Sequence, residues 1–215
     1  MAKGKCLSFA SLLLAVLAMA AFPRLAPAEG PALREIRTEH YLIHTDLDDA
    51  LAGDLAKLME GMFGEYSRRL AAFQQQVEVK NLDVYLFTHK ADYMRLTEDR
   101  FRNTGGIFVA GRKNLLAAFL EDQGRDTLRR TLQHEAFHQF AYNMISPDLP
   151  IWLNEGMAQV FEEGLWVGDN FVLGQVSPRR LRQLRADIDG SRLVDFQTFM
   201  AITPEEWSKN LWADA

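Results

Sequence analysis

The segment His134-Glu135-Ala136-Phe137-His138 carries the residues best suited to chemistry in this chain. It lies within residues 125–145, where apolar positions recur at helical spacing. Helix positions four apart lie on one face, one turn apart, so both imidazoles can reach one metal ion. Glu135 projects from another part of the helix surface and is suited to act as a general base on water. The pentad therefore predicts a catalytic zinc site.

A catalytic zinc site needs three protein ligands and one open position. No histidine follows His138, which leaves a carboxylate as the third ligand on a following element. Glu155 is the best placed, because it lies 17 residues after His138, past a loop that contains Pro147 and Pro150. It stands near the start of a second predicted helix, residues 152–163.

These residues resemble a known family. The pentad and the run Trp152-Leu153-Asn154-Glu155-Gly156-Met157-Ala158 are similar to the gluzincin metallopeptidases of the peptidase-MA-like superfamily, and the resemblance covers residues 134–162. It implies that His134, His138 and Glu155 bind one Zn²⁺ per chain. It also implies that Glu135 is the general base and proton shuttle in peptide-bond hydrolysis.

The resemblance implies further roles outside the ligand set. Gln159 stands four residues after Glu155, where some relatives place an acid that holds a ligand imidazole by its other nitrogen. Tyr142 is the candidate oxyanion stabiliser. A strand that precedes the zinc helix and pairs with extended substrate would be residues 115–120, with Leu115, Leu116, Ala117 and Ala118 as its pairing residues.

The pattern of predicted elements favours an α+β fold, because strands come early and helices late. We expect a zincin-like fold, a small mixed sheet followed by an active-site helix and a glutamate helix. Besides those two helices, the predicted elements are a strand at 36–45, a helix at 48–73, a strand at 82–88, a short helix at 91–96, strand-like runs at 107–110 and 115–120, a hairpin at 164–176 and a helix at 178–188.

The N-terminus has the layout of a secretory signal peptide. Lys3 and Lys5 precede an apolar stretch, residues 7–22, and the triplet Ala26-Pro27-Ala28 follows it. We expect cleavage after Ala28, which leaves a single peptidase domain over residues 29–215. That domain would be secreted or periplasmic, without a stable membrane anchor.

The composition of the mature chain excludes some kinds of ligand and partner. Removal of residues 1–28 leaves 21 basic against 29 acidic residues and takes away Cys6, the only cysteine. Disulfides and thiolate ligands are therefore excluded from the mature chain, and its negative net charge argues against a nucleic-acid partner. The expected partner is a peptide or protein substrate, and the sequence assigns no oligomeric state.

Two features lie beyond the predicted site. A predicted helix at 204–213 places Trp207, Leu211 and Trp212 on an apolar face close to the last residue, which favours a truncated member of the family. The helix at 178–188 carries a basic stripe, for which a solvated face is favoured over recognition of a substrate carboxylate. The stripe consists of Arg179, Arg180, Arg182 and Arg185.

Two alternatives to a peptidase stay open. The first is a zinc-binding but catalytically inactive scaffolding or binding protein of the cell envelope. The second is a structural envelope domain in which the pentad is coincidental. Metal content separates the second alternative from the others, and the role of Glu135 separates an enzyme from a scaffold.

Overall fold

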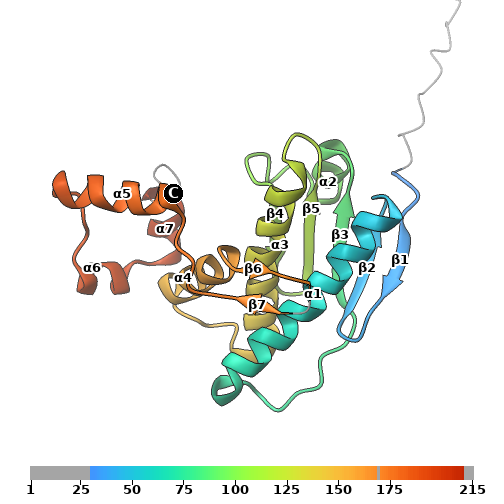
Figure 1. Cartoon of the computed structure of the whole chain (residues 1–215), viewed down its shortest axis with the longest axis horizontal. Helices are drawn as coiled ribbons and strands as arrows, with labels where there is room; N and C mark the ends of the chain where they lie inside the picture. The colour runs from blue at the N-terminus through green and yellow to red at the C-terminus, as the bar shows by residue number, and fades with distance from the viewer. Residues whose placement is uncertain (1–29, 169, 211–215) are drawn as a thin grey trace, which may run out of the picture. The chain divides into compact units, whose positions relative to one another are not determined.

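A five-stranded mixed sheet forms the centre of the fold in the computed structural model, which describes residues 30–168 and 170–210 (Figure 1). The strand order is β1-β2-β3-β5-β4. The outer pairs β1–β2 and β4–β5 are antiparallel, whereas β3 runs parallel to both β2 and β5. The strands are β1 (Arg34–Arg37), β2 (Tyr41–Thr45), β3 (Leu82–Phe87), β4 (Gly106–Val109) and β5 (Leu115–Phe119).

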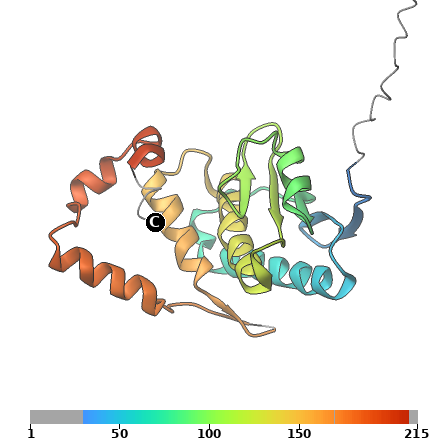
Figure 2. The same cartoon turned by 90° about the horizontal axis from the view of Figure 1, so that it is seen from above.

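Helices cover both faces of this sheet, and the fold is α+β, as predicted. Figure 2 shows α1 and α3 on one face of the sheet and α2 on the other. A second, two-stranded sheet, β6 with β7, follows α4. The helices are α1 (Asp49–Arg69), α2 (Lys90–Leu96), α3 (Gly124–Phe140), α4 (Ile151–Glu162), α5 (Pro178–Asp189), α6 (Phe196–Ala201) and α7 (Pro204–Asn210), and the short strands are β6 (Leu165–Trp166) and β7 (Phe171–Val172).

One predicted strand, residues 36–45, is instead a hairpin formed by β1 and β2. Its turn is closed by Thr38, whose backbone N–H and hydroxyl both donate to the carbonyl oxygen of Tyr41. His40 leaves the turn toward α1, where Glu60 accepts hydrogen bonds from its backbone N–H and pairs with its Nδ1. A strand pattern cannot reveal such a turn, because none of these residues is a strong turn former.

The long helix α1 forms where periodicity predicts it. The Asp48 side chain caps its first turn by accepting a hydrogen bond from the Leu51 N–H at 2.9 Å. Its buried face packs on α3 through aromatic contacts, with Phe63 and Phe140 5.3 Å apart and Tyr66 and Phe137 5.6 Å apart between ring centroids. Tyr66 also donates through its hydroxyl to the carbonyl oxygen of Gln133, which fixes the two helices in register.

The side chain of Gln133 ties α3 to the end of α4. It is only 4% exposed, and its Nε2 donates to the carbonyl oxygens of Phe161 and Gly164, both at 2.9 Å. Buried amide groups are costly unless they are paired, so these bonds define the distance between the two helices. The predicted zinc-binding residues lie on these two helices.

Residues 1–29, which hold the predicted signal peptide, and residues 211–215, which hold Leu211 and Trp212 of the predicted helix at 204–213, lie outside the described residues. Among the helices that the structure does describe, none combines the length and apolar character needed to cross a membrane. The helix α6 contacts the start of α4, with Phe196 6.2 Å and Phe199 6.4 Å from Trp152 between ring centroids.

Candidate metal centre

The two histidines of the pentad lie on one face of α3, as the spacing predicts. Their ring centroids are 4.8 Å apart, and both side chains are largely shielded from solvent. The opposite face of α3 is buried in the core through Leu128, Leu132 and Phe140. Core packing therefore turns His134 and His138 toward α4.

Glu155 meets these histidines from α4. Its Oε2 is 3.4 Å from Nε2 of His134, and its Oε1 is 3.6 Å from Nε2 of His138. Two nitrogen or oxygen ligands of a tetrahedral zinc ion stand about 3.4 Å apart, as follows from bond lengths near 2.1 Å. The three donor atoms lie within 4.8 Å of one another, so this set fits a zinc ion.

Each imidazole is held by its other nitrogen. Nδ1 of His134 lies 3.1 Å from Oε2 of Glu162, and Nδ1 of His138 lies 3.1 Å from Oδ1 of Asn154. These acceptors fix the tautomer that leaves Nε2 as the inward-facing donor atom. The arrangement is the one that metal-binding histidines require.

The prediction that Gln159 holds a ligand imidazole by its other nitrogen is wrong. Its Oε1 accepts a hydrogen bond from Nη1 of Arg180 instead, and Glu162 occupies the position beside His134. Seven residues are close to two helical turns, so Glu162 returns to the face of α4 that carries Glu155. Asn154 directly precedes Glu155 in the sequence. The one signal that could have identified Asn154 and Glu162 in advance is that each has a side chain able to accept a hydrogen bond.

The ionisation of His134 is coupled to that of Glu155 and Glu162. Burial alone would lower the pKa of His134, but hydrogen bonds with Glu155 and Glu162 outweigh it and raise this pKa to about 10. Burial would raise the pKa of Glu155 and of Glu162, but the hydrogen bond each shares with His134 keeps both values below the usual range. Without a metal, a proton on His134 thus balances the two carboxylates, and a metal ion must displace it.

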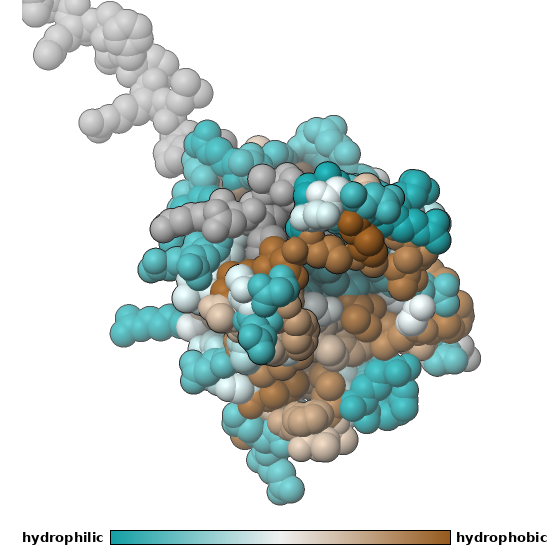
Figure 3. Space-filling model, turned by 90° about the vertical axis from the view of Figure 1, so that its left-hand side faces the viewer, coloured by the Kyte–Doolittle hydropathy of each residue, from teal (hydrophilic) through white to brown (hydrophobic). Residues whose placement is uncertain are grey.

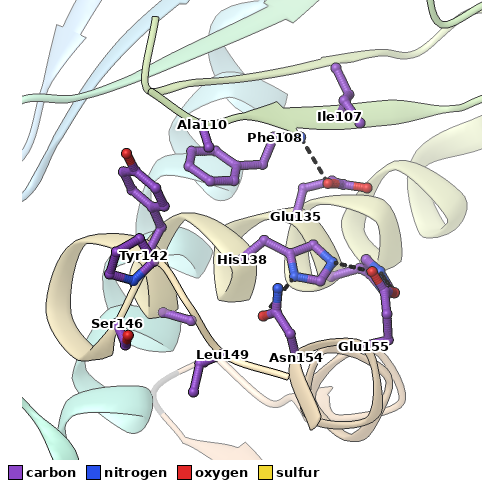
Figure 4. Close-up of a pocket in the computed structure, with 13 residues that line it drawn as sticks. Ile107, Phe108, Ala110, Glu135, His138, Tyr142, Ser146, Leu149, Asn154 and Glu155 are labelled. Carbon is purple, nitrogen blue, oxygen red and sulfur yellow. Dashed lines mark hydrogen bonds and ion pairs between the residues drawn. The ribbon is translucent and has the colours of Figure 1, made fainter. Parts of the chain in front are cut away.

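Glu135 points away from this donor set (Figure 4). Its Oε2 accepts a hydrogen bond of 2.9 Å from the backbone N–H of Phe108 in β4. The same residue borders a cavity that also exposes His134, His138 and Glu155. Its placement separates it from the ligands, as the sequence predicts for a general base.

The cavity has a polar end at these four side chains and an apolar wall elsewhere. Tyr142 belongs to this lining and lies in a π-helical turn, Ala141–Ile145, that continues α3. Its ring centroid is 5.8 Å from that of Phe108, and Figure 4 shows the two rings side by side. The apolar wall is formed by Ile107, Phe108, Ala110, Pro147 and Leu149.

The strand beside the cavity is β4, which corrects the predicted substrate-pairing strand. Leu115, Leu116, Ala117 and Ala118 belong to β5, which is paired with β3 on one side and β4 on the other. Its backbone groups are therefore committed to the sheet. The edge strand is β4. The backbone N–H of Phe108 points to Glu135, so the backbone groups of alternate residues of β4 point away from β5, to the cavity side.

A second group, formed by Glu39, His40 and Glu60, also has donor atoms close enough to hold a metal ion. Glu60 is already paired through both oxygens with His40, at 2.8 Å to its backbone N–H and 2.7 Å to its Nδ1. The His40 ring stacks on Phe63, with centroids 3.7 Å apart. These contacts anchor the β1–β2 turn to α1.

Comparison with known proteins adds one finding. Residues 129–210 match the sequence model of a family described as a protein of unknown function (DUF1570). The matched region begins within α3 and includes the donor residues His134, His138 and Glu155, whereas the five-stranded sheet lies before it. No curated protein matches the chain.

Proposed function

We propose that this protein is an exported zinc-dependent peptidase of the gluzincin type. The observation that carries the proposal is the convergence of His134, His138 and Glu155 while Glu135 stays outside their donor set, at the wall of the same cavity. Structural zinc sites are usually closed by four protein ligands, whereas catalytic sites keep one position open. The three-donor arrangement beside a cavity supports the catalytic type.

A bound zinc ion would supply a Lewis acid for a peptide carbonyl and would make a water molecule more acidic. The protein supplies the proton transfers. Glu135 is held by Phe108 through Oε2, so Oε1 is the atom that accepts the proton of the attacking water and later delivers it to the leaving amine. Asn154 and Glu162 keep the imidazoles oriented during this exchange.

The cavity wall suits an extended peptide. The N–H of Phe108 is held by Glu135, but the edge strand β4 keeps outward carbonyl groups for pairing with a substrate strand, and the apolar wall beside it accepts an apolar side chain. Recognition by backbone pairing is independent of substrate sequence. A peptide or protein substrate is therefore the class that these residues favour.

The decisive experiment measures zinc content and peptide hydrolysis on the same preparations. Purified protein should contain about one zinc ion per chain, and His134→Ala, His138→Ala and Glu155→Ala should each lose it. The matched control is His89→Ala, because the His89 side chain is 62% exposed and lies outside the cavity lining. Zinc retained by all three variants would overturn the assigned ligands.

The variant Glu135→Gln separates an enzyme from a zinc-binding scaffold. It should keep the zinc ion, because Glu135 is outside the donor set, and lose hydrolysis of a peptide library followed by mass spectrometry. Glu98→Gln is the control that should change neither property, because Glu98 follows the end of α2, is exposed and pairs with Lys113. Wild-type protein that binds zinc and cleaves no peptide would favour the scaffolding function.

A further inference from the structure

The helix α5 reaches the metal centre through a single side chain. None of its residues is fully buried, and its apolar residues Leu181, Leu184 and Ile188 are 40%, 48% and 53% exposed. Figure 3 shows hydrophobic side chains gathered at the surface on this side of the molecule. Among the described residues, the side-chain hydrogen bonds and ion pairs from α5 to α4 all come from Arg180.

Each guanidinium nitrogen of Arg180 contacts a different residue at the end of α4, two within the helix and one at its C-cap, Glu163. Its Nε donates to Oε1 of Glu163 at 3.0 Å, and its Nη1 donates to Oε1 of Gln159 at 3.3 Å. Its Nη2 lies 3.5 Å from Oε2 of Glu162. The planar arginine fork can satisfy three acceptors at once, which a lysine ammonium at one point cannot do in the same geometry.

The local sequence sets the direction of this side chain. Ser177 caps α5 by accepting a hydrogen bond from the Arg180 N–H at 3.3 Å, and Pro178 occupies the first helical position. Arg180 is thereby fixed in the first turn of α5, facing α4. Arg179, Arg182 and Arg185 are exposed, in agreement with the solvated face predicted for the basic stripe, whereas Arg180 departs from that prediction and is partly buried.

Glu162 contacts both Arg180 and the metal centre. One atom, its Oε2, lies 3.1 Å from Nδ1 of His134 and 3.5 Å from Nη2 of Arg180. We propose that Arg180 is a positioning residue for the zinc site, which fixes the carboxylate of Glu162 and through it the imidazole of His134. The inference rests on the zinc-binding part of the proposed function.

The need for such a residue follows from the flexibility of Glu162. Its side chain is 23% exposed, so without a cation on its outer side the carboxylate can rotate toward water instead of His134. The other nearby cation, Arg130 of α3, pairs with Oε2 of Glu163 at 3.5 Å. Arg130 also attracts the Glu162 carboxylate at longer range, but among the described residues the arginine that forms an ion pair with Glu162 is Arg180.

The test is a double-mutant cycle with zinc affinity as the readout, measured by competition with a chromophoric chelator. Loss of a residue that orients a metal ligand costs about 10- to 100-fold in affinity. Since Arg180 acts one step further out, Arg180→Gln should weaken zinc binding about tenfold. In the Glu162→Gln background, Arg180→Gln should have no further effect, because the carboxylate that connects Arg180 to His134 is already missing.

Two further variants sharpen the test. Arg182→Gln removes the same charge from the exposed side of the same helix and should leave zinc affinity unchanged. Arg180→Lys should fall between wild type and Arg180→Gln, because it keeps the charge and loses the fork. Since α5 has no buried residue, the variants should stay folded, and urea unfolding monitored by circular dichroism checks this. Should Arg180→Gln unfold, the same cycle is completed with Arg180→Lys.

The outcomes are distinct. A zinc-affinity loss for Arg180→Gln that disappears in the Glu162→Gln background supports the inference. An equal loss in both backgrounds, an equal loss for Arg182→Gln, or no loss at all overturns it while leaving the zinc site intact. Wild-type protein that binds no zinc would instead overturn the proposed function on which the inference rests.

Discussion

The backbone N–H of Phe108 donates a 2.9 Å hydrogen bond to Oε2 of Glu135. This bond joins the edge strand β4 to the helix that carries the pentad, across the cavity that both elements line. A side chain meant to move protons must be held within hydrogen-bond reach of its partners. The edge strand therefore fixes the orientation of the Glu135 carboxylate, the group that we propose as the general base.

We expect Phe108→Pro to lower the rate of peptide hydrolysis without loss of zinc. Proline removes the N–H that holds Glu135, and a hydrogen bond to a charged group is worth about 1.5 kcal/mol or more, equal to about tenfold in rate. Phe108→Ala is the control, because it removes the ring and keeps the N–H. Equal kcat values for the two variants would show that the bond to Glu135 has no catalytic value.

The contact of Asn154 with His138 gives a prediction about metal affinity alone. Its Oδ1 accepts from Nδ1 of His138 at 3.1 Å, so Asn154→Ala should leave this imidazole free to rotate. Zinc affinity should fall about 10-fold or more, as for other partners of ligand imidazoles. Chelator competition measures the effect, with Asn114→Ala as a control at an asparagine that pairs with Asn143 instead. An unchanged affinity would mean that packing alone orients His138.

The buried amide of Gln133 gives a prediction about stability. In Gln133→Leu, the carbonyl oxygen of Gly164 loses the donor that Gln133 supplies, whereas that of Phe161 keeps the backbone N–H of Gly164 at 3.0 Å. A buried group that loses its partner costs about 1 to 3 kcal/mol, so the free energy of unfolding should drop by about 2 kcal/mol. Urea unfolding of Gln133→Leu and of the exposed control Gln183→Leu measures this. A loss no larger than that of the control contradicts the role assigned to Gln133.

The pair formed by Glu60 and His40 makes stability depend on pH. Burial would raise the pKa of Glu60, but hydrogen bonds with His40 and Thr38 outweigh it and lower this pKa. A carboxyl whose pKa is lower in the folded state stabilises the fold above its unfolded pKa, about 4.3, and this contribution disappears as pH falls through the folded pKa.

Glu60→Gln should therefore be less stable than wild type at pH 7 and should lose less stability between pH 5 and pH 3. Urea unfolding at both pH values measures the difference. Asp54→Asn is the control, since Asp54 is an exposed residue of the same helix, α1. Parallel pH profiles for wild type and Glu60→Gln would show that the pair carries no pH dependence.

Much of the site follows from the sequence because it is local. His134 and His138 share a face as soon as α3 forms, since 3.6 residues per turn determine their spacing whatever surrounds them. The same holds for α1, whose apolar periodicity and Asp48 cap identify it without knowledge of its partners. The α+β class likewise follows from the order of the elements along the chain.

Contacts between different helices and strands could be predicted less well from the sequence. Gln159 and Glu162 stand on neighbouring turns of α4, and only the angle between α3 and α4 decides that His134 meets Glu162 while Gln159 turns to Arg180. Leu115 and Phe108 stand in adjacent strands, and only the order of pairing places β5 inside the sheet and β4 at its edge.

The sequence by itself determined that His134 and His138 share one face of a helix and that Glu135 projects from another, because helix geometry repeats over a few residues. The tertiary structure alone decided which side chains hold the imidazoles, which strand borders the cavity, and that Arg180 reaches Glu162. Those relationships depend on how whole helices and strands pack, and packing is set by the buried surfaces of the entire chain rather than by neighbours in sequence.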